Sequence, residues 1–218
     1  MRIDPAGYPF IAGSLAAAVL LGWFDGRWAG MLCLLFAVFC LFFFRDPERA
    51  VAAVSAAVLS PADGRVLVAG PTTGQSVPPG QWQQVSIFLS PMDVHVNRMP
   101  IGGTVTKVEY HPGRFLPAYR AEAGDLNEFT EIWVDHDGQR IVCRQIVGIL
   151  ARRIVCRARV GDRVNAGQRF GIMKFGSRMD VFVPSTARVM VHINDRVRGG
   201  VSVIAMLEEG HNSDGPRA

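Results

Sequence analysis

The chain has few cysteines, and none of them has a spacing that binds a metal. The four are Cys33, Cys40, Cys143 and Cys156, and they form neither a CxxC pair nor a Cys/His pattern. The sequence therefore predicts no metal site. Scattered thiols of this kind are typical of a protein in a reducing compartment, so we expect all four to be free.

A signature of nucleic-acid binding is also missing. The formal net charge is +4, but no stripe of lysine and arginine is interleaved with aromatic residues. We therefore expect no nucleic-acid partner. Basic and acidic side chains balance within residues 1–50, so the excess charge belongs to residues 51–218. A mildly basic soluble part suits contact with an anionic lipid surface.

Helical periodicity is hard to find after residue 50, apart from a possible short turn near 117–122. Short runs rich in Val and Ile are instead separated by Gly, Pro and Asp, which is typical of a β-sandwich or barrel-like domain. The candidate strands are 64–69, 83–89, 103–110, 130–135, 139–147, 151–159, 169–174, 178–183, 187–192 and 201–207. The predicted fold class is therefore mainly β.

Two apolar runs, 8–24 and 28–44, precede the β-rich part and are separated only by Asp25-Gly26-Arg27. Each run could form about 25 Å of helix, which is at the short limit for crossing a bilayer. Because three residues suffice for a tight connection, we predict an N-terminal apolar helical hairpin. It either spans the membrane or lies in one leaflet. A hairpin buried in a soluble core is the alternative.

Arg2 precedes the hairpin, and Arg45 and Arg49 follow it, which favours a cytoplasmic position for both ends. Pro47 ends the second helix. A cleaved signal peptide is disfavoured because a second apolar run follows at once. We expect a protein at the cytoplasmic face of the cell membrane. Its parts would be a membrane-associating hairpin in 1–50, a β domain in 51–207 and a flexible tail in 208–218.

A weak internal repeat lies in the second half of the chain. The segment Val160-Gly-Asp-Arg-Val-Asn-Ala-Gly167 is similar to Ile193-Asn-Asp-Arg-Val-Arg-Gly-Gly200, and a β-rich run follows each. Paired turns of this kind recur in lipoyl and biotinyl carrier domains, so a hairpin repeat of that type is expected. This leaves open a membrane-tethered carrier that uses Lys174 of the Met173-Lys174 pair.

The bond between Gly176 and Ser177 carries the sharpest chemical hypothesis. Glycine lacks a Cβ and permits strained backbone and close approach. A serine hydroxyl that attacks the preceding carbonyl converts the amide into an ester, and β-elimination then breaks the chain and leaves a pyruvoyl group. Because Gly-Ser is a common pair, a simple structural turn is the alternative interpretation.

Two further segments could carry proton chemistry. Asp63 lies in the turn Ser60-Pro-Ala-Asp-Gly, where an Asx-type turn is the structural alternative. Asp93 and His95 lie two residues apart and would share one face of a strand. Histidine moves protons near neutral pH, although a hydrogen-bonded structural role fits as well. His111 begins a Pro- and Gly-containing loop that could cover a site.

These segments together resemble the short form of phosphatidylserine decarboxylase, and the likeness covers nearly the whole chain. It is carried by the apolar hairpin that ends in Arg45-Asp-Pro, and by Ser60-Pro-Ala-Asp-Gly64, Ser90-Pro-Met-Asp-Val-His95, Met99-Pro100, His111-Pro-Gly-Arg-Phe-Leu116, Asn127-Glu128 and Phe175-Gly-Ser177. Each piece is modest, but their order and spacing together are specific.

The resemblance implies a proenzyme that cuts itself before Ser177. The products would be a β chain of residues 1–176 and an α chain of residues 177–218, paired as a heterodimer. The resemblance also allows a higher oligomer of this heterodimer. The α chain would begin with a pyruvoyl cofactor, which forms a Schiff base with phosphatidylserine. Loss of CO₂ and hydrolysis then give phosphatidylethanolamine. By the same likeness, Asp63 assists self-cleavage and His95 serves decarboxylation.

The chain departs from longer members of that family at one informative position. They carry a second histidine three residues after the first, where this chain has Arg98. Arginine stays protonated and cannot act as a base. Either His95 therefore takes both tasks or Asp63 activates Ser177 directly. Arg98, like His111, could instead bind the substrate. The segment Phe-Gly-Ser-Arg also replaces the longer members' Leu-Gly-Ser-Thr.

Overall fold

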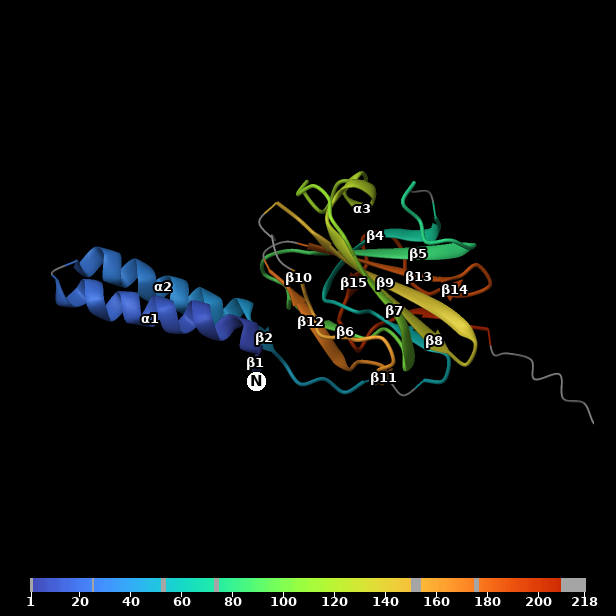
Figure 1. Ribbon diagram of the computed structural model, residues 1–218, viewed down its shortest axis with the longest axis horizontal. Coiled ribbons are helices and arrows are strands. Elements are labelled where there is room, and N and C mark those ends of the chain that lie inside the picture. Colours follow the sequence, from blue (N-terminus) through green and yellow to red (C-terminus); the bar gives the residue numbers. More distant parts are fainter. Residues whose placement is uncertain are drawn as a thin grey trace, which may run out of the picture.

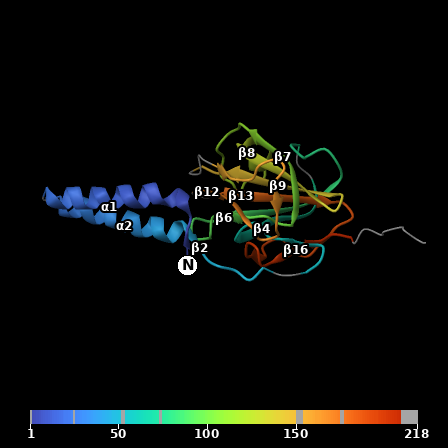
Figure 2. The same ribbon diagram turned by 60° about the horizontal axis from the view of Figure 1, so that its bottom comes forward.

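A computed structural model describes residues 2–24, 26–51, 54–72, 75–149, 154–174 and 177–208. A helical hairpin projects from one end of a β domain, and the same arrangement is seen in both views (Figures 1 and 2). Apart from Glu208, the tail predicted at 208–218 lies outside the described residues.

The predicted hairpin is confirmed as helices α1 (Tyr8–Trp23) and α2 (Arg27–Phe43), preceded by the 3-10 turn η1 (Pro5–Gly7). The segment Pro5–Trp23 is long and apolar enough to cross a membrane by length and composition, whereas α2 is shorter. Apolar side chains cover the outer surface of the hairpin, and Trp23 at the end of α1, for example, is 84% exposed. A soluble core hairpin would bury such side chains, so that alternative is wrong and membrane association is indicated.

The base of the hairpin is fastened to the β domain. Strand β1 (Arg2–Ile3) pairs with β2 (Arg45–Asp46) and closes the hairpin. Phe43 and Phe44 at the end of α2 are fully buried, and they pack with Val94, Val96 and Ile172 of the β domain. The hairpin therefore meets the domain through a small apolar core of its own.

The β domain is built on a curled antiparallel sheet of eight strands in the order β11-β7-β8-β9-β13-β5-β4-β15 (Figure 1). In chain order these strands are β4 (Gly64–Pro71), β5 (Trp82–Leu89), β7 (Gly103–His111), β8 (Phe129–His136), β9 (Gln139–Val147), β11 (Arg163–Val164), β13 (Ser177–Pro184) and β15 (Arg196–Val197).

Two three-stranded sheets complete the domain, in the orders β10-β12-β6 and β14-β16-β3. Their strands are β3 (Ala57–Leu59), β6 (Val96–Arg98), β10 (Ile154–Cys156), β12 (Arg169–Met173), β14 (Arg188–Val189) and β16 (Val203–Met206). The main hydrophobic core joins residues of all three sheets, including Val58, Val181 and Phe170.

Most predicted strands are confirmed to within a residue or two, and the mainly β class is correct. The strand predicted at 187–192 shortens to Arg188–Val189, and of 151–159 only Ile154–Cys156 is a strand within the described residues. The helical turn expected near 117–122 lies slightly later, as α3 (Ala123–Leu126). Two-residue strands such as β11 escaped prediction because so short a run shows no alternation.

The internal repeat corresponds to two turns at opposite edges of the curled sheet, and these turns contain β11 and β15. In the first turn the Val105 N–H donates to the Asp162 carbonyl over 2.9 Å, and in the second the Val66 N–H donates to the Asp195 carbonyl over 2.9 Å. Both turns end on a glycine with φ of 73°, a conformation in which a Cβ is strained. The sequence similarity therefore reflects the same local backbone used twice.

Candidate active site

The sequence motifs meet at one end of the curled sheet. Ser177, the first residue of β13, is paired with Val147 at the end of β9 and with Leu89 at the end of β5. Beyond Leu89 the row continues through Gly64, which begins β4 and pairs with Val197. The segments that contain Asp63, His95 and Arg198 all adjoin this row, so the fold gathers residues far apart in the sequence.

Close backbone packing explains the glycine of the Asp-Gly pair. A Cβ at Gly64 would lie 2.1 Å from the Phe88 carbonyl oxygen on the neighbouring strand. Any larger residue would push β4 away from β5. Gly64 therefore fixes the start of β4, and with it the place of Asp63 at the sheet end.

Ser177 is fully buried, and its Oγ has no hydrogen-bond partner among the described residues. The alternation of β13 places Ser177 with Met179 and Val181, which are core residues. Only three residues separate β13 from the end of β12 in the neighbouring sheet, so Ser177 is the first residue of the eight-stranded sheet after the chain leaves β12. Gly176 itself lies outside the described residues. A buried, unpaired hydroxyl is uncommon and needs an explanation.

His95 is buried just before β6, and its ring lies against Phe43 of α2 with centroids 4.1 Å apart. Its Nδ1 lies 3.0 Å from the Asp93 carbonyl oxygen. Because a carbonyl can only accept, Nδ1 carries the proton and Nε2 carries the lone pair. Burial lowers the pKa of His95 from 6.5 to about 4, so the imidazole is neutral near pH 7. Its Nε2 is buried and has no hydrogen-bond partner in the part of the chain that the structure describes.

Asn97 and Gln145 form a buried polar pair that sequence reasoning missed. Both are fully buried, and the Gln145 amide donates to Asn97 Oδ1 over 2.8 Å. The pair links β6 to β9, two residues along from Val147. Asn97 Nδ2 and Gln145 Oε1 have no partner among residues that the structure describes, and the same holds for His95 Nε2 and Ser177 Oγ. No local sequence pattern marks the pair, because its members come from two sheets.

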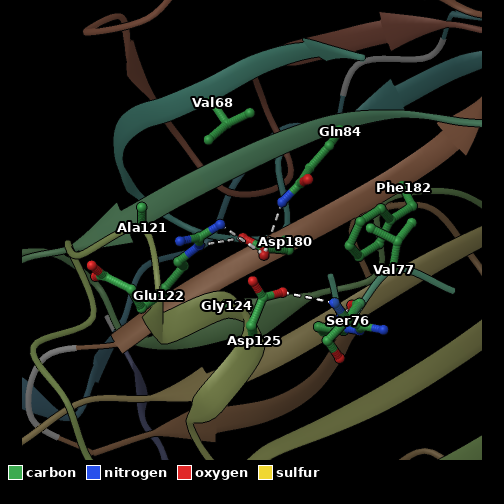
Figure 3. Close-up of a pocket in the computed structure, with 12 residues that line it drawn as sticks. Val68, Ser76, Val77, Gln84, Ala121, Glu122, Gly124, Asp125, Asp180 and Phe182 are labelled. Atoms are coloured by element: carbon green, nitrogen blue, oxygen red, sulfur yellow. Dashed lines mark hydrogen bonds and ion pairs between the residues drawn. The ribbon is translucent and has the colours of Figure 1, made fainter. Parts of the chain in front are cut away.

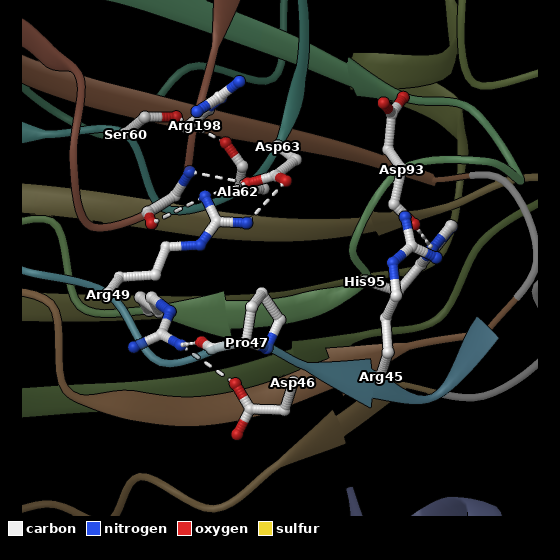
Figure 4. Close-up of polar contacts among 12 residues, drawn as sticks. Arg45, Asp46, Pro47, Arg49, Ser60, Ala62, Asp63, Asp93, His95 and Arg198 are labelled. Carbon is white, nitrogen blue, oxygen red and sulfur yellow. Dashed lines mark hydrogen bonds and ion pairs between the residues drawn. The ribbon is translucent and has the colours of Figure 1, made fainter. Parts of the chain in front are cut away.

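Asp63 is held by partners that are remote in sequence (Figure 4). Both nitrogens of the Arg49 guanidinium tip donate to its carboxylate over 2.8 Å, and so does the Gly199 N–H. The Asx-type turn considered from sequence is not the arrangement found among the described residues. Among the described residues, Asp63 forms no hydrogen bond or ion pair with Ser177 or His95; in Figure 4 its carboxylate faces Arg49 and lies apart from His95.

Arg98 is buried and fastened by three oxygens. It donates to Asp46 Oδ1 and to the carbonyls of Pro47 and Gly167, over 2.9, 2.9 and 3.1 Å. The guanidinium therefore ties the chain that follows the hairpin to the first repeat turn. This network accounts for a buried arginine at the position where longer members of the resembled family carry a histidine.

The loop that begins at His111 is tied to the partner strand of Ser177. The Asn127 amide bonds both backbone groups of Leu116 and also donates to the Val147 carbonyl over 2.8 Å. His111 stacks on Phe129 at 4.4 Å and lies near Glu109 and Glu131. Because Glu131 already accepts from Arg144 and Trp133, its charge is compensated, and we assign no metal to this group.

A cavity of about 210 Å³ lies on the opposite face of the sheet (Figure 3). Arg178, the residue after Ser177, points to this face and bonds Asp180 through two nitrogens, over 2.6 and 3.0 Å. The sheet separates these side chains from that of Ser177. The buried Arg178–Asp180 pair therefore fixes the start of β13 from the face of the sheet opposite to Ser177.

Comparison with known proteins gives one consistent result. The family model for phosphatidylserine decarboxylase matches residues 36–205. A phosphatidylserine decarboxylase proenzyme of Granulibacter bethesdensis is 45% identical over 93% of this chain and 84% of its own length. Proteins of the same name from Gluconacetobacter diazotrophicus and Solibacter usitatus are 43% and 44% identical, and each match covers 94% of this chain. They cover 95% and 97% of those relatives.

Proposed function

The chain belongs to the phosphatidylserine decarboxylase family and is a carboxy-lyase made as a proenzyme, and we propose that it creates its own cofactor from Ser177. The observation that carries the proposal is the buried, unpaired Ser177 Oγ at the sheet end where the family motifs meet. Within the described part of the chain, no hydrogen bond of this hydroxyl has to break before it reacts. A hydroxyl that served only a turn would be expected to bond a nearby backbone group.

In this proposal, self-cleavage proceeds in three chemical steps. The Ser177 oxygen attacks the Gly176 carbonyl carbon, and the C–N bond breaks as an ester forms and the amine is freed. Loss of the Cα proton of residue 177 expels the Gly176 carboxylate and leaves dehydroalanine. Water then replaces the amine, which leaves as ammonia. The chain ends as residues 1–176 and 177–218, held together as a heterodimer by the pairing of β13 with β5 and β9.

His95 is proposed to move the protons in both self-cleavage and decarboxylation. Its Nε2 carries a lone pair and no hydrogen bond, so it can accept the serine proton. Arg98 cannot take this task, and Asp63 is committed to Arg49 and Gly199. Of the two possibilities left open by the sequence, this arrangement favours His95 in both roles. Asp63 then assists by fixing the loop after Ser60.

The pyruvoyl carbonyl, once present, supplies an electron sink for the bond to the leaving carboxylate after it condenses with the substrate amine. The chain's residues provide the surroundings. The fully buried Met179 and Leu89 keep the surroundings of residue 177 apolar, which favours loss of a charged carboxylate. His95 delivers the proton that replaces CO₂. Arg98 and His111 are further candidates for substrate binding, and Arg98 would first have to leave its present partners.

The hairpin is proposed to hold the site against the cytoplasmic face of the cell membrane, where phosphatidylserine is the partner. In this division residues 1–50 attach to the membrane and 51–207 form the catalytic domain. Exposed apolar helices and the arginines at the hairpin base support the placement. We also propose that the two repeat turns share the design of lipoyl and biotinyl carriers, although the chain's chemistry does not use Lys174.

One substitution separates this proposal from a carrier that uses Lys174. Ser177→Ala should leave an unbroken chain that releases no CO₂ from phosphatidylserine. Ser185→Ala is the matched control, because Ser185 is an exposed serine just beyond the other end of β13. A Ser177→Ala protein that still decarboxylates, or active wild-type protein with a mass addition on Lys174 and no chain break, would reject the proposal.

A further inference from the structure

We propose that Arg45 and Arg198 form an anion site for the phosphate diester of the lipid substrate. The inference rests on the proposed function and adds the place where the headgroup is held. The site is a cavity of about 470 Å³ between the hairpin base and the β domain. Its lining includes Arg45, Arg49, Arg198, Glu48, Asp63 and Val94, several of which are seen in Figure 4.

The cavity lies at the depth where a lipid headgroup is expected. Arg45 follows the buried Phe43 and Phe44 at the end of α2, and the preceding turns of that helix expose apolar side chains. A hairpin embedded by those side chains would place Arg45 at the membrane surface, where phosphates lie. The lipid's acyl chains could then stay in the bilayer while its headgroup enters the cavity.

The charges around the cavity do not cancel. Two of the five charged lining residues are carboxylates, and each already has a cation: Asp63 is paired with Arg49 at 2.8 Å, and Glu48 with Arg2 at 3.3 Å. Within the described part of the chain, Arg45 and Arg198 form no ion pair. Two arginines without an ion pair that line one cavity suit a phosphate, whose oxygens accept several charge-assisted hydrogen bonds.

Arg45 is held ready for such a ligand. Its two terminal nitrogens donate to the carbonyls of Phe42 and Met92, over 2.8 and 2.6 Å. These neutral acceptors fix the side chain without neutralising it. Arg198 is exposed, and its side chain has no hydrogen bond to the described residues. One arginine is therefore preorganised, and the other is free to close on the headgroup.

The cavity also connects to the chemistry. Val94 lines it and precedes His95. Val197, next to Arg198, lies in the row that contains Ser177, three strand spacings or about 14 Å away. An extended arginine side chain and a serine headgroup can span such a gap together. After cleavage Arg45 belongs to the longer chain and Arg198 to the shorter one, so both chains complete the site.

The phosphate is present in substrate, transition state and product, so its binding should be uniform along the reaction. Loss of uniform binding raises KM and leaves kcat nearly unchanged. A charge-assisted hydrogen bond contributes enough for about a tenfold or larger effect. This separates a headgroup contact from a role in His95 chemistry, which would lower kcat instead.

The test compares wild-type enzyme with Arg45→Gln, Arg198→Gln and the control Arg188→Gln, using phosphatidylserine in mixed micelles. Arg188 is an exposed arginine of the same short chain, on β14 away from the hairpin (Figure 1). Mass spectrometry first establishes that each protein is cut before residue 177, because an uncut wild-type would defeat the proposed function rather than this inference. We expect KM to rise about tenfold in Arg45→Gln and Arg198→Gln, and not in Arg188→Gln.

A competition experiment assigns the effect to phosphate. Glycerophosphoethanolamine should inhibit better than ethanolamine, which lacks the phosphate, and Arg198→Gln should abolish most of that preference. Vesicles of phosphatidylcholine should still bind Arg198→Gln as they bind wild-type. The lipid assignment is overturned if KM is unchanged, if kcat alone falls, or if the preference for glycerophosphoethanolamine survives. Inhibition by inorganic phosphate with unchanged lipid KM would show a free-anion site instead.

Discussion

Arg49 holds Asp63 through two hydrogen bonds of 2.8 Å each, and the two residues belong to different parts of the fold. Arg49 follows the helical hairpin, whereas Asp63 lies in the turn that begins β4. A planar guanidinium and a carboxylate in this arrangement are both oriented and charge-matched. The membrane-proximal segment is thus coupled directly to the loop next to the proposed active site.

Replacing Arg49 should slow self-cleavage as well as weaken the fold. Arg49→Gln removes both bonds and leaves Asp63 with the Gly199 N–H, at a cost of about 2 kcal/mol. Arg49→Lys keeps the charge but not the two-pronged geometry, so it should fall between wild-type and Arg49→Gln. Chain breakage followed on denaturing gels, together with urea unfolding, measures both effects. Cleavage of Arg49→Gln at the wild-type rate would show that Asp63 needs no orienting partner.

Removal of the His95 imidazole should impair both reactions. His95→Ala is expected to cleave itself at least a hundredfold more slowly, because a positioned general base contributes about that much or more. Any His95→Ala protein that does cleave itself should release no CO₂ from phosphatidylserine. His136→Ala is the control. Like His95, His136 has its Nδ1 next to a backbone carbonyl oxygen, at 2.8 Å, but it lies at the other end of the sheet. Normal self-cleavage by His95→Ala would assign the serine proton to Asp63.

Protonation of His95 should contribute to acid sensitivity. Its pKa is about 4 when folded and near 6.5 when unfolded, so the unfolded chain binds the extra proton first as pH falls. The stabilisation is complete above pH 6.5 and is lost progressively between pH 6.5 and 4, by about 3 kcal/mol in total. In His95→Gln this component should be absent. Identical slopes of unfolding free energy against pH in both proteins would contradict a neutral buried His95.

The Asn97–Gln145 pair should be energetically coupled. Asn97→Ala leaves the buried Gln145 amide without its acceptor and should cost about 2 kcal/mol of stability. Gln145→Ala should cost a similar amount, and the double variant should cost less than the sum of both. Denaturant unfolding of the four proteins measures this coupling. Strict additivity would mean that the hydrogen bond does not link the two sheets.

Much of the fold could be read from local patterns. Strands such as Gly103–His111 and Gln139–Val147 alternate or are rich in β-branched residues, and Gly or Asp residues mark their ends. The continuous apolar runs identified the hairpin, because no soluble surface would expose them. The order of the motifs around Asp63, His95 and Ser177 was sufficient for the family.

The contacts that organise the site could not be read in the same way. Asp63 is held by Arg49 and by Gly199, which is 136 residues away, and Phe43 covers His95 from a separate element. Such contacts depend on how sheets curl and pack, which leaves no periodic signal in the sequence. Edge strands of two residues also leave no recognisable sequence pattern, since they are defined by their pairing partners rather than by their own composition.

The most direct measurement is the mass of each chain in purified, active protein under denaturing conditions. The account predicts two fragments, residues 1–176 and 177–218 of the 218-residue sequence, the shorter one starting with a pyruvoyl group instead of serine. Treatment with borohydride in the presence of phosphatidylserine should attach the substrate amine to the shorter fragment. Full activity from an intact chain, with an ordinary serine amide at 177, would contradict it.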